Sequence, residues 1–205
     1  HRHRHVAPAD PFAQQRVLGP KVGQSAGELL AGSGWMEGGD YGVMVIEVET
    51  LSVCLDRTDA EREQIMAAGA TEDKFVTVPY DGTTDVALSA AGPVITANPG
   101  INHWVVVACN DEGVSGGLNA LRNAGFAAGD IIGVGLGAYE ACRPWQEGIE
   151  TGYRSALYLS GVDVGKAAAE ALIAQIQDGT ALPAETVANT TMVTPETWDG
   201  VMPCG

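Results

Sequence analysis

The residues best suited to chemistry in this sequence are an arginine, an asparagine and a glycine-rich loop, each at the end of an apolar segment. Arg57 stands in the segment 49–58, Asn110 lies in the segment 109–113, and the loop 133–137 has the pattern G-x-G-x-G. A guanidinium offers five hydrogen-bond donors in a rigid fork, and an amide both donates and accepts. Such groups suit a polar small molecule that carries hydroxyls or a carboxylate.

Each of these features also has an ordinary structural explanation. Arg57 could pair at the surface with Asp56 or Glu61, and on composition alone that explanation is favoured. Asn110 or Asp111 could cap a helix. The glycine pattern resembles a dinucleotide fingerprint, but its third glycine falls too early. A tight turn that lets the backbone approach a ligand is therefore the preferred interpretation.

Tyr139 and Trp145 follow the glycine loop and are candidates for stacking on a sugar ring. Three nearby acids are not brought together by any pattern, so a solvated helix face is expected for Glu140, Glu147 and Glu150. We recognise no nucleophile elbow, no metal-ligand set and no cofactor motif. The sequence therefore predicts binding without catalysis and without a cofactor.

Alternating strands and helices must position these residues. The predicted strands are Tyr41–Val48, Lys74–Pro79, His103–Cys109, Asp130–Gly135, Tyr153–Leu159 and Glu185–Thr194. The predicted helices are Val22–Gly34, Asp59–Ala68, Thr84–Ala97, Asp111–Asn123, Tyr139–Gly148 and Val162–Gln177. Pro93 should kink or split the third helix. The alternation predicts an α/β fold, a doubly wound parallel sheet with helices on both faces. Because the carboxyl ends of such strands form the ligand crevice, Arg57, Asn110 and Gly137 should share one rim.

Composition narrows the class of partner. The chain has 205 residues, 45% of them hydrophobic, which is enough for one sizeable core. Its net charge of −15 repels nucleic acid and anionic lipid, so we expect no nucleic-acid partner. No apolar run approaches the roughly 20 residues of a membrane helix. The start of the chain shows no apolar segment of a signal peptide, and the alternating histidines of residues 1–5 are left outside the fold argument.

The four cysteines show neither a C-x-x-C pair nor zinc spacing. Cys109 ends an apolar strand, and we interpret it as a small buried hydrophobe. Cys142 and Cys204 could pair in an oxidising compartment. The sequence alone leaves that pairing open.

The segment Ile101–Gly137 resembles the periplasmic sugar-binding proteins of the type I fold, and in particular their arabinose-binding members. The segment Leu51–Thr58 matches the arginine-bearing turn of that family. Pro20–Gly23 with Gly34-Trp35 matches the helix before it. The likeness runs from about Val17 to Thr194, and its most specific part is Asn110-Asp111 followed by Gly116-Gly117.

The resemblance implies that Arg57 and Asn110 hydrogen-bond a pyranose. The second ligand-binding asparagine of the family corresponds to Gly137, so one sugar contact is missing, and Tyr139 or Glu140 is the candidate replacement. The predicted ligand site is Arg57, Asn110, Asp111, Gly137 and Tyr139.

Members of that family have two lobes, and the resemblance implies that this chain is the second. We expect a terminal segment at 1–16, a sugar-binding lobe at 17–160, and a crossover helix, return strand and tail at 161–205. The implied function is part of the substrate-binding component of a sugar ABC uptake system, periplasmic or otherwise extracytoplasmic. It would bind a neutral monosaccharide, such as arabinose or a related pyranose, and would work with a membrane permease.

Two alternatives stay open. One is the effector-binding domain of a sugar-responsive transcription regulator, and the other is an enzyme on a flavodoxin-like sheet. The helix predicted at 162–177 carries an apolar stripe that needs a packing partner. The stripe consists of Val164, Ala168, Leu172 and Ile176. Without the first lobe, we expect this helix to fold back on its own sheet or to pair with a second copy.

Overall fold

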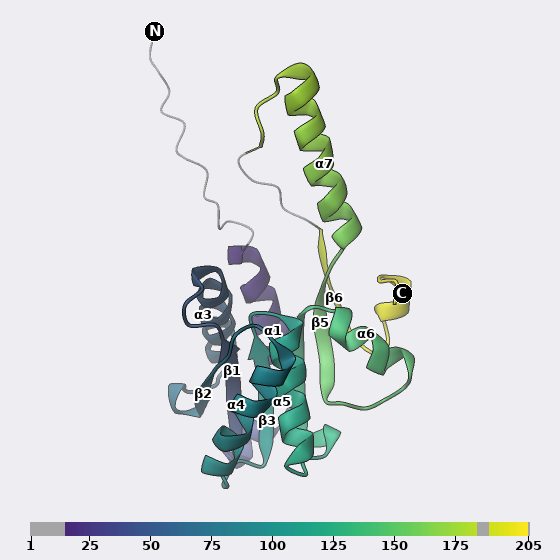
Figure 1. Ribbon diagram of the computed structural model, residues 1–205. Helices are drawn as coiled ribbons and strands as arrows, with labels where there is room; N and C mark the ends of the chain where they lie inside the picture. Colours follow the sequence, from purple (N-terminus) through teal and green to yellow (C-terminus); the bar gives the residue numbers. More distant parts are fainter. Residues whose placement is uncertain (1–14, 184–188, 205) are drawn as a thin grey trace.

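The computed structural model describes residues 15–183 and 189–204, and their strands form a single six-stranded sheet of order β2-β1-β3-β4-β5-β6 (Figure 1). The strands are β1 (Tyr41–Glu47), β2 (Phe75–Pro79), β3 (His103–Ala108), β4 (Ile131–Gly137), β5 (Tyr153–Leu159) and β6 (Thr190–Val193). The first five are mutually parallel, whereas β6 runs antiparallel to β5. The predicted α/β sheet is confirmed, with this antiparallel return as the exception. The predicted last strand began at Glu185, but residues 184–188 lie outside the described part.

Helices cover both faces of the sheet. They are α1 (Gln15–Ser33), α2 (Trp35–Gly38), α3 (Ser52–Ala67), α4 (Thr84–Ala97), α5 (Asp111–Asn123), α6 (Tyr139–Gln146) and α7 (Gly161–Asp178), with short 3-10 turns at Glu72–Lys74, Ala128–Asp130 and Trp198–Gly200. Helices α1 and α3 pack on one face and α4 and α5 on the other. Every residue of β1 is buried, with Val43 in one core cluster and Met44 in the other. This two-sided burial explains the nearly continuous apolar run.

Two helix predictions were wrong in detail. Helix α3 begins at Ser52 rather than at Asp59, and its N-cap, Leu51, makes no side-chain cap hydrogen bond. Arg57 therefore lies on the helix rather than in a turn. Helix α4 runs through Pro93 as one element, so the split that was one of the two expected effects of this proline does not occur, and the expected kink stays a prediction.

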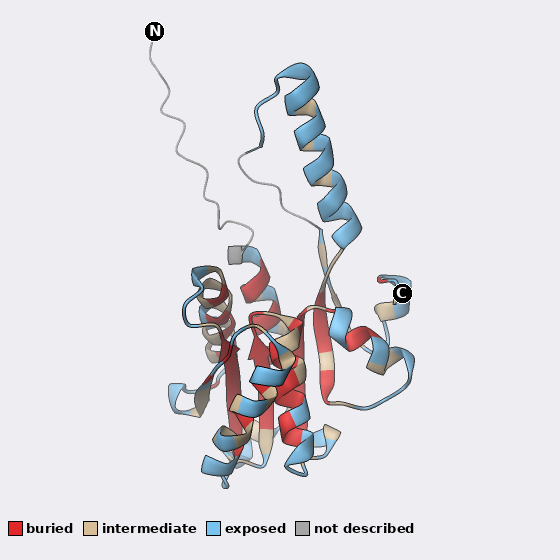
Figure 2. Ribbon diagram, in the orientation of Figure 1, coloured by how far each residue is buried: buried red, intermediate tan, exposed pale blue. Residues whose placement is uncertain are grey.

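Helix α7 is set apart from the rest of the molecule. It rises beyond the carboxyl edge of the sheet and has no buried residue along its length (Figures 1 and 2). Its apolar stripe is open to solvent, with Ile176 81% exposed. Of the two expected alternatives for this helix, folding back on its own sheet is therefore wrong, and pairing with a second copy stays a prediction.

Two disulfides join distant segments. Cys54 in α3 is bonded to Cys109 at the end of β3, and Cys142 in α6 is bonded to Cys204 in the tail. Cys109 is buried as predicted, but it is a half-cystine rather than a free apolar side chain. The pairing of Cys142 with Cys204, left open by the sequence, is present. Within residues 15–183 and 189–204, no helix combines the length and apolar character needed to cross a bilayer.

Candidate functional site

Arg57 lies against the end of β3. Its Nη1 donates a hydrogen bond to the carbonyl oxygen of Cys109 at 2.6 Å. The Cys54–Cys109 disulfide ties the same helix to the same strand end. Partial burial lowers the pKa of Arg57, while neighbouring Glu61, Tyr80 and Tyr139 favour its charged form. The strand order reverses between β1 and β3, so this arginine lies at the switch point where open α/β sheets bind ligands.

Asn110, the next residue after Cys109, caps helix α5. Its Oδ1 accepts hydrogen bonds from the backbone N–H of Gly113 at 2.9 Å and from the hydroxyl of Tyr80 at 2.6 Å. Its Nδ2 donates to the carbonyl oxygen of Gly82 at 3.1 Å. The helix-cap explanation for Asn110 is thus realised. An Nδ2 group carries two hydrogens, so the cap does not by itself prevent contact with a ligand.

Asp111 lies beneath the rim, with 0% of its surface exposed. Its Oδ2 accepts a hydrogen bond from the backbone N–H of Glu140 at 3.1 Å, which fixes the start of α6. Its Oδ1 is buried without a hydrogen-bond partner among the described residues. Burial, with Glu112 and Glu140 nearby, raises the pKa of Asp111 to about 7. The geometry gives Asp111 a supporting position rather than a surface for a ligand.

The loop after β4 brings Gly137 and Tyr139 to the same edge. Gly137 has a φ of 132°, and the next residue, Ala138, has a φ of 70°, a conformation that costs energy for a residue with a Cβ. Tyr139 opens α6, is 54% exposed, and donates from its hydroxyl to Oε2 of Glu112 at 2.6 Å. The structure therefore places Arg57, Asn110, Gly137 and Tyr139 together at the carboxyl edge, above Asp111.

Three residues of this edge were missed by sequence reasoning. Tyr80 follows β2 and Glu112 lies in the first turn of α5, so the rule about carboxyl strand ends could have found both. Glu61 was considered only as a surface partner of Arg57, and its sequence position gave no sign of burial. It is fully buried, neither of its carboxylate oxygens has a hydrogen-bond partner among the described residues, and burial raises its pKa well above the usual range.

Two hollows flank Tyr139. One, of about 540 Å³, is lined by Gly137, Gln146 and Tyr158 among others. The other, of about 440 Å³, is lined by Ser115, Asn119 and Tyr153 among others. Trp145, the other stacking candidate, packs edge-on against Tyr153 with 6.3 Å between ring centroids. In the described part of the chain, no three His, Cys, Asp or Glu side chains gather as a metal site.

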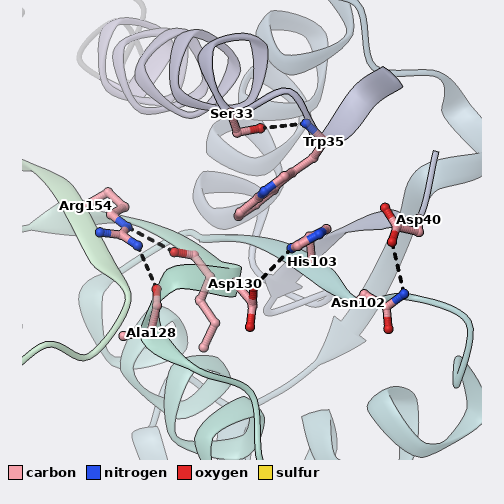
Figure 3. A network of polar contacts seen from close by, with 9 residues as sticks. Ser33, Trp35, Asp40, Asn102, His103, Ala128, Asp130 and Arg154 are labelled. Carbon is pink, nitrogen blue, oxygen red and sulfur yellow. Dashed lines mark hydrogen bonds and ion pairs between the residues drawn. The ribbon is translucent and has the colours of Figure 1, made fainter. Parts of the chain in front are cut away.

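A separate polar network lies at the amino edge of the sheet (Figure 3). Trp35 stacks on His103 with 4.6 Å between ring centroids, and His103 Nδ1 lies 3.4 Å from Asp130 Oδ1. Arg154 donates to the carbonyl oxygen of Ala128 at 2.7 Å. An open groove of about 870 Å³ runs along α1 beside Trp35 and Arg154. These contacts join the ends of elements, and none involves a residue of the predicted ligand site.

The sheet, its helical layers and its carboxyl-edge site define one lobe of the type I periplasmic binding protein fold. A solved solute-binding protein of an ABC transporter from Actinobacillus succinogenes 130z, with bound D-allose, superposes with a TM-score of 0.70. It is 18% identical in sequence, and the match covers 89% of this chain and 60% of that one.

Two curated relatives are similar in sequence. The ABC transporter L-arabinose-binding periplasmic protein of Azospirillum brasilense is 31% identical over 186 residues, 90% of this chain and 55% of the relative. The L-arabinose-binding periplasmic protein of Escherichia coli (strain K12) is 30% identical over 155 residues, 73% of this chain and 47% of the relative. This chain thus spans about half the length of the curated relatives it matches. No protein-family model matches the sequence. The predicted resemblance to periplasmic sugar-binding proteins of the arabinose-binding type is confirmed.

Proposed function

We propose that this chain forms the second lobe of the substrate-binding component of a sugar ABC uptake system, with a neutral monosaccharide such as arabinose or a related pyranose as ligand. The observation that supports this most directly is the adjacency of Arg57 and Asn110. These are the residues that the resemblance assigns to the pyranose, and the Arg57 guanidinium bonds the residue next to Asn110. Arg57, Asn110, Gly137 and Tyr139 would form the ligand edge, and Asp111 would support it.

The proposed division of the chain is a terminal segment at 1–16, the sugar-binding lobe at 17–160, and the crossover helix with its return at 161–205. The coverage of about half of each curated relative supports a single lobe. The exposed stripe of α7 would then pack on a first lobe, or on a second copy of this chain. A membrane permease would be the further partner.

An extracytoplasmic location fits the cysteine chemistry. Both disulfides of the described residues need an oxidising compartment to persist. The names of both curated relatives describe periplasmic binding proteins rather than regulators or enzymes. We therefore propose binding without catalysis. No specific feature of the described residues favours the two alternatives, the effector-binding domain of a transcription regulator and an enzyme on a flavodoxin-like sheet.

The test is a titration of the chain with neutral sugars, nucleotides and amino acids, followed by calorimetry and thermal unfolding. The lone lobe should bind sugar weakly, because half of an enclosing surface is absent from it. Arg57→Ala should weaken sugar binding by roughly 10- to 100-fold, as expected for hydrogen bonds to a charged group. Arg122→Ala, an exposed arginine at the far end of α5, is the matched control and should bind as the parent does. Stabilisation by a nucleotide alone would contradict the proposal.

A further inference from the structure

The ring of Tyr139 occupies the space that a side chain on Gly137 would need. A Cβ placed on Gly137 would overlap Cε1 of Tyr139 and would lie 2.8 Å from Cδ1. The φ of 132° at Gly137 is also strained for any residue with a side chain. With Tyr139 placed as it is, a side chain at position 137 would clash with the ring, and the group that faces outward there is Tyr139.

Tyr139 does not act alone at this point. Its hydroxyl donates to Glu112 Oε2 at 2.6 Å, in a bond between the start of α6 and the first turn of α5. Burial and the adjacent carboxylate raise the pKa of Tyr139, so the hydroxyl keeps its proton. That proton is donated in the hydrogen bond to Glu112. What the pair then offers is acceptors only: the lone pairs of the Tyr139 oxygen and the carboxylate of Glu112.

Glu140, the other candidate replacement, is used differently. Its backbone N–H donates to the buried carboxylate of Asp111, which fixes the loop, while its exposed side chain lines the same hollow as Tyr139. Tyr139 is among the groups close enough to Arg57 to influence the pKa of the guanidinium. The edge therefore combines a donor-only group, Arg57, with an acceptor-only pair.

We propose that Tyr139 and Glu112 together form a specificity-determining pair at the ligand edge. The exposed ring of Tyr139 packs against a C–H face of the sugar, and the pair accepts a hydrogen bond from a ligand hydroxyl. This inference rests on the proposed sugar-binding function and adds to it the chemistry of one subsite.

In the resembled family an asparagine amide stands where this chain has Gly137. Its replacement by the Tyr139–Glu112 pair would change which ligands this subsite selects. An amide accepts a ligand donor and also donates to a ligand acceptor, whereas the pair tolerates only a donor. A sugar hydroxyl can donate. The carboxylate of a uronic acid cannot, and the charge of Glu112 repels it. The pair therefore selects neutral sugars over their uronic acids.

The experiment uses the full 205-residue chain and its variants Y139F, E112Q, the double variant and R57A. Affinities for L-arabinose, D-galactose and D-galacturonate are measured by ligand-observed NMR titration. Y139F and E112Q should each weaken binding of the neutral sugar roughly 10-fold, and the double variant should be little weaker than either, because the two residues act as one unit. E112Q should also narrow the preference for galactose over galacturonate. Glu72→Gln, an exposed carboxylate of the 3-10 turn that precedes β2 and is remote from the carboxyl edge, is the charge-matched control and should change nothing. Thermal unfolding of each variant checks that the fold is intact.

The outcomes separate the two proposals. Sugar binding that is lost in R57A but within twofold of the parent in Y139F and E112Q would contradict this inference alone. So would additive losses with the preference for neutral sugar unchanged in E112Q. Absence of any sugar binding by the parent chain would contradict the proposed function, and the subsite with it.

Discussion

Helices α5 and α7 each begin at a side-chain cap and each carry an apolar stripe, yet their surroundings are opposite. Asn110 caps α5, which buries eight residues against the sheet and α4. Ser160 caps α7 in the same way, accepting from the backbone N–H of Asp163 at 3.2 Å, but α7 buries none. The same local pattern thus produces a core element in one place and an unpartnered surface in another. The sequence pattern specifies a helix and its apolar face. The order in which the strands and helices are connected decides whether another element can pack on that face.

The test with the largest expected effect compares the same substitution, leucine to alanine, in α5 and in α7. Leu121→Ala in α5 removes a fully buried side chain and should lower the free energy of unfolding by about 2–5 kcal/mol. Leu172→Ala in α7, where the leucine is 50% exposed, should change it by less than about 0.5 kcal/mol. Urea unfolding of both variants measures the difference. A loss at Leu172 as large as that at Leu121 would mean that α7 is packed in solution, and the contrast would fail.

A second test concerns buried carboxyl groups, which α3 and α5 contain, at Glu61 and Asp111, and α7 does not. Asp111 has a pKa of about 7 in the folded chain, above the ordinary value of roughly 4 when unfolded. Between these values unfolding releases a proton, so its contribution is full below pH ~4, falls as the pH rises, and levels off above pH ~7. The total should be on the order of 2–4 kcal/mol.

Asp111→Asn should flatten this slope, as measured by denaturant unfolding from pH 4 to 8. Asp163→Asn, in the exposed first turn of α7, is the matched control and should leave the slope as it is. Equal pH profiles for the parent and the Asp111 variant would show that this carboxyl is not buried as described.

The two caps offer a smaller and closely matched comparison. Asn110→Ala should cost about 1–2 kcal/mol of unfolding free energy, because Gly113 and Tyr80 both lose an acceptor in a part-buried place. Ser160→Ala should fray the first turn of α7 and leave global unfolding nearly unchanged. Hydrogen exchange, read amide by amide, distinguishes local fraying from global loss. Similar global losses in both variants would remove the distinction between the helices.

The smallest expected effect lies at the outer end of the stripe. Ile176→Glu should shift the unfolding free energy by no more than a few tenths of a kcal/mol, since Ile176 is 81% exposed. If α7 pairs two copies of the chain, the same substitution should dissociate them, because a buried charge in an apolar contact is costly. Sedimentation of the parent and the variant reports this. If the parent chain is monomeric at all concentrations, pairing of two copies through α7 is excluded. A first lobe is then the remaining candidate to cover the apolar stripe of α7.

Sequence reasoning succeeded where a pattern is periodic and failed where long-range contacts decide. The five parallel strands were predicted to within two residues at each end, and Tyr153–Leu159 matches β5. The last strand was not, because β6 begins at Thr190 and Asn189 is outside it. The start of α3 was missed, because the turns from Ser52 are held by contacts with a distant segment, the Cys54–Cys109 disulfide and the hydrogen bond from Arg57 to Cys109. That error hid the burial of Glu61. The Cys54–Cys109 bond joins residues 55 positions apart, and no local signal encodes such a pairing.

At the site, the rule for strand ends led to Arg57, Asn110 and Gly137, and it could also have pointed to the region of Glu112, but it gave no reason to single Glu112 out. That residue matters because of a side-chain contact with Tyr139, which depends on how α5 and α6 are placed relative to each other. The expectation that α7 folds back failed for a related reason. An apolar stripe shows that a helix needs a partner, but not where that partner is.

The register of the last two strands has a consequence for engineering. Leu159 at the end of β5 pairs with Thr190 at the start of β6, so residues 160–189 leave and re-enter the sheet at neighbouring points. An antiparallel pair can be closed by a two-residue turn such as Asn-Gly. The segment 160–189 is thus an insertion between two strand ends that already pair as the two sides of a hairpin. It could be exchanged for a short turn to give a minimal scaffold, or for a foreign domain whose termini lie close together.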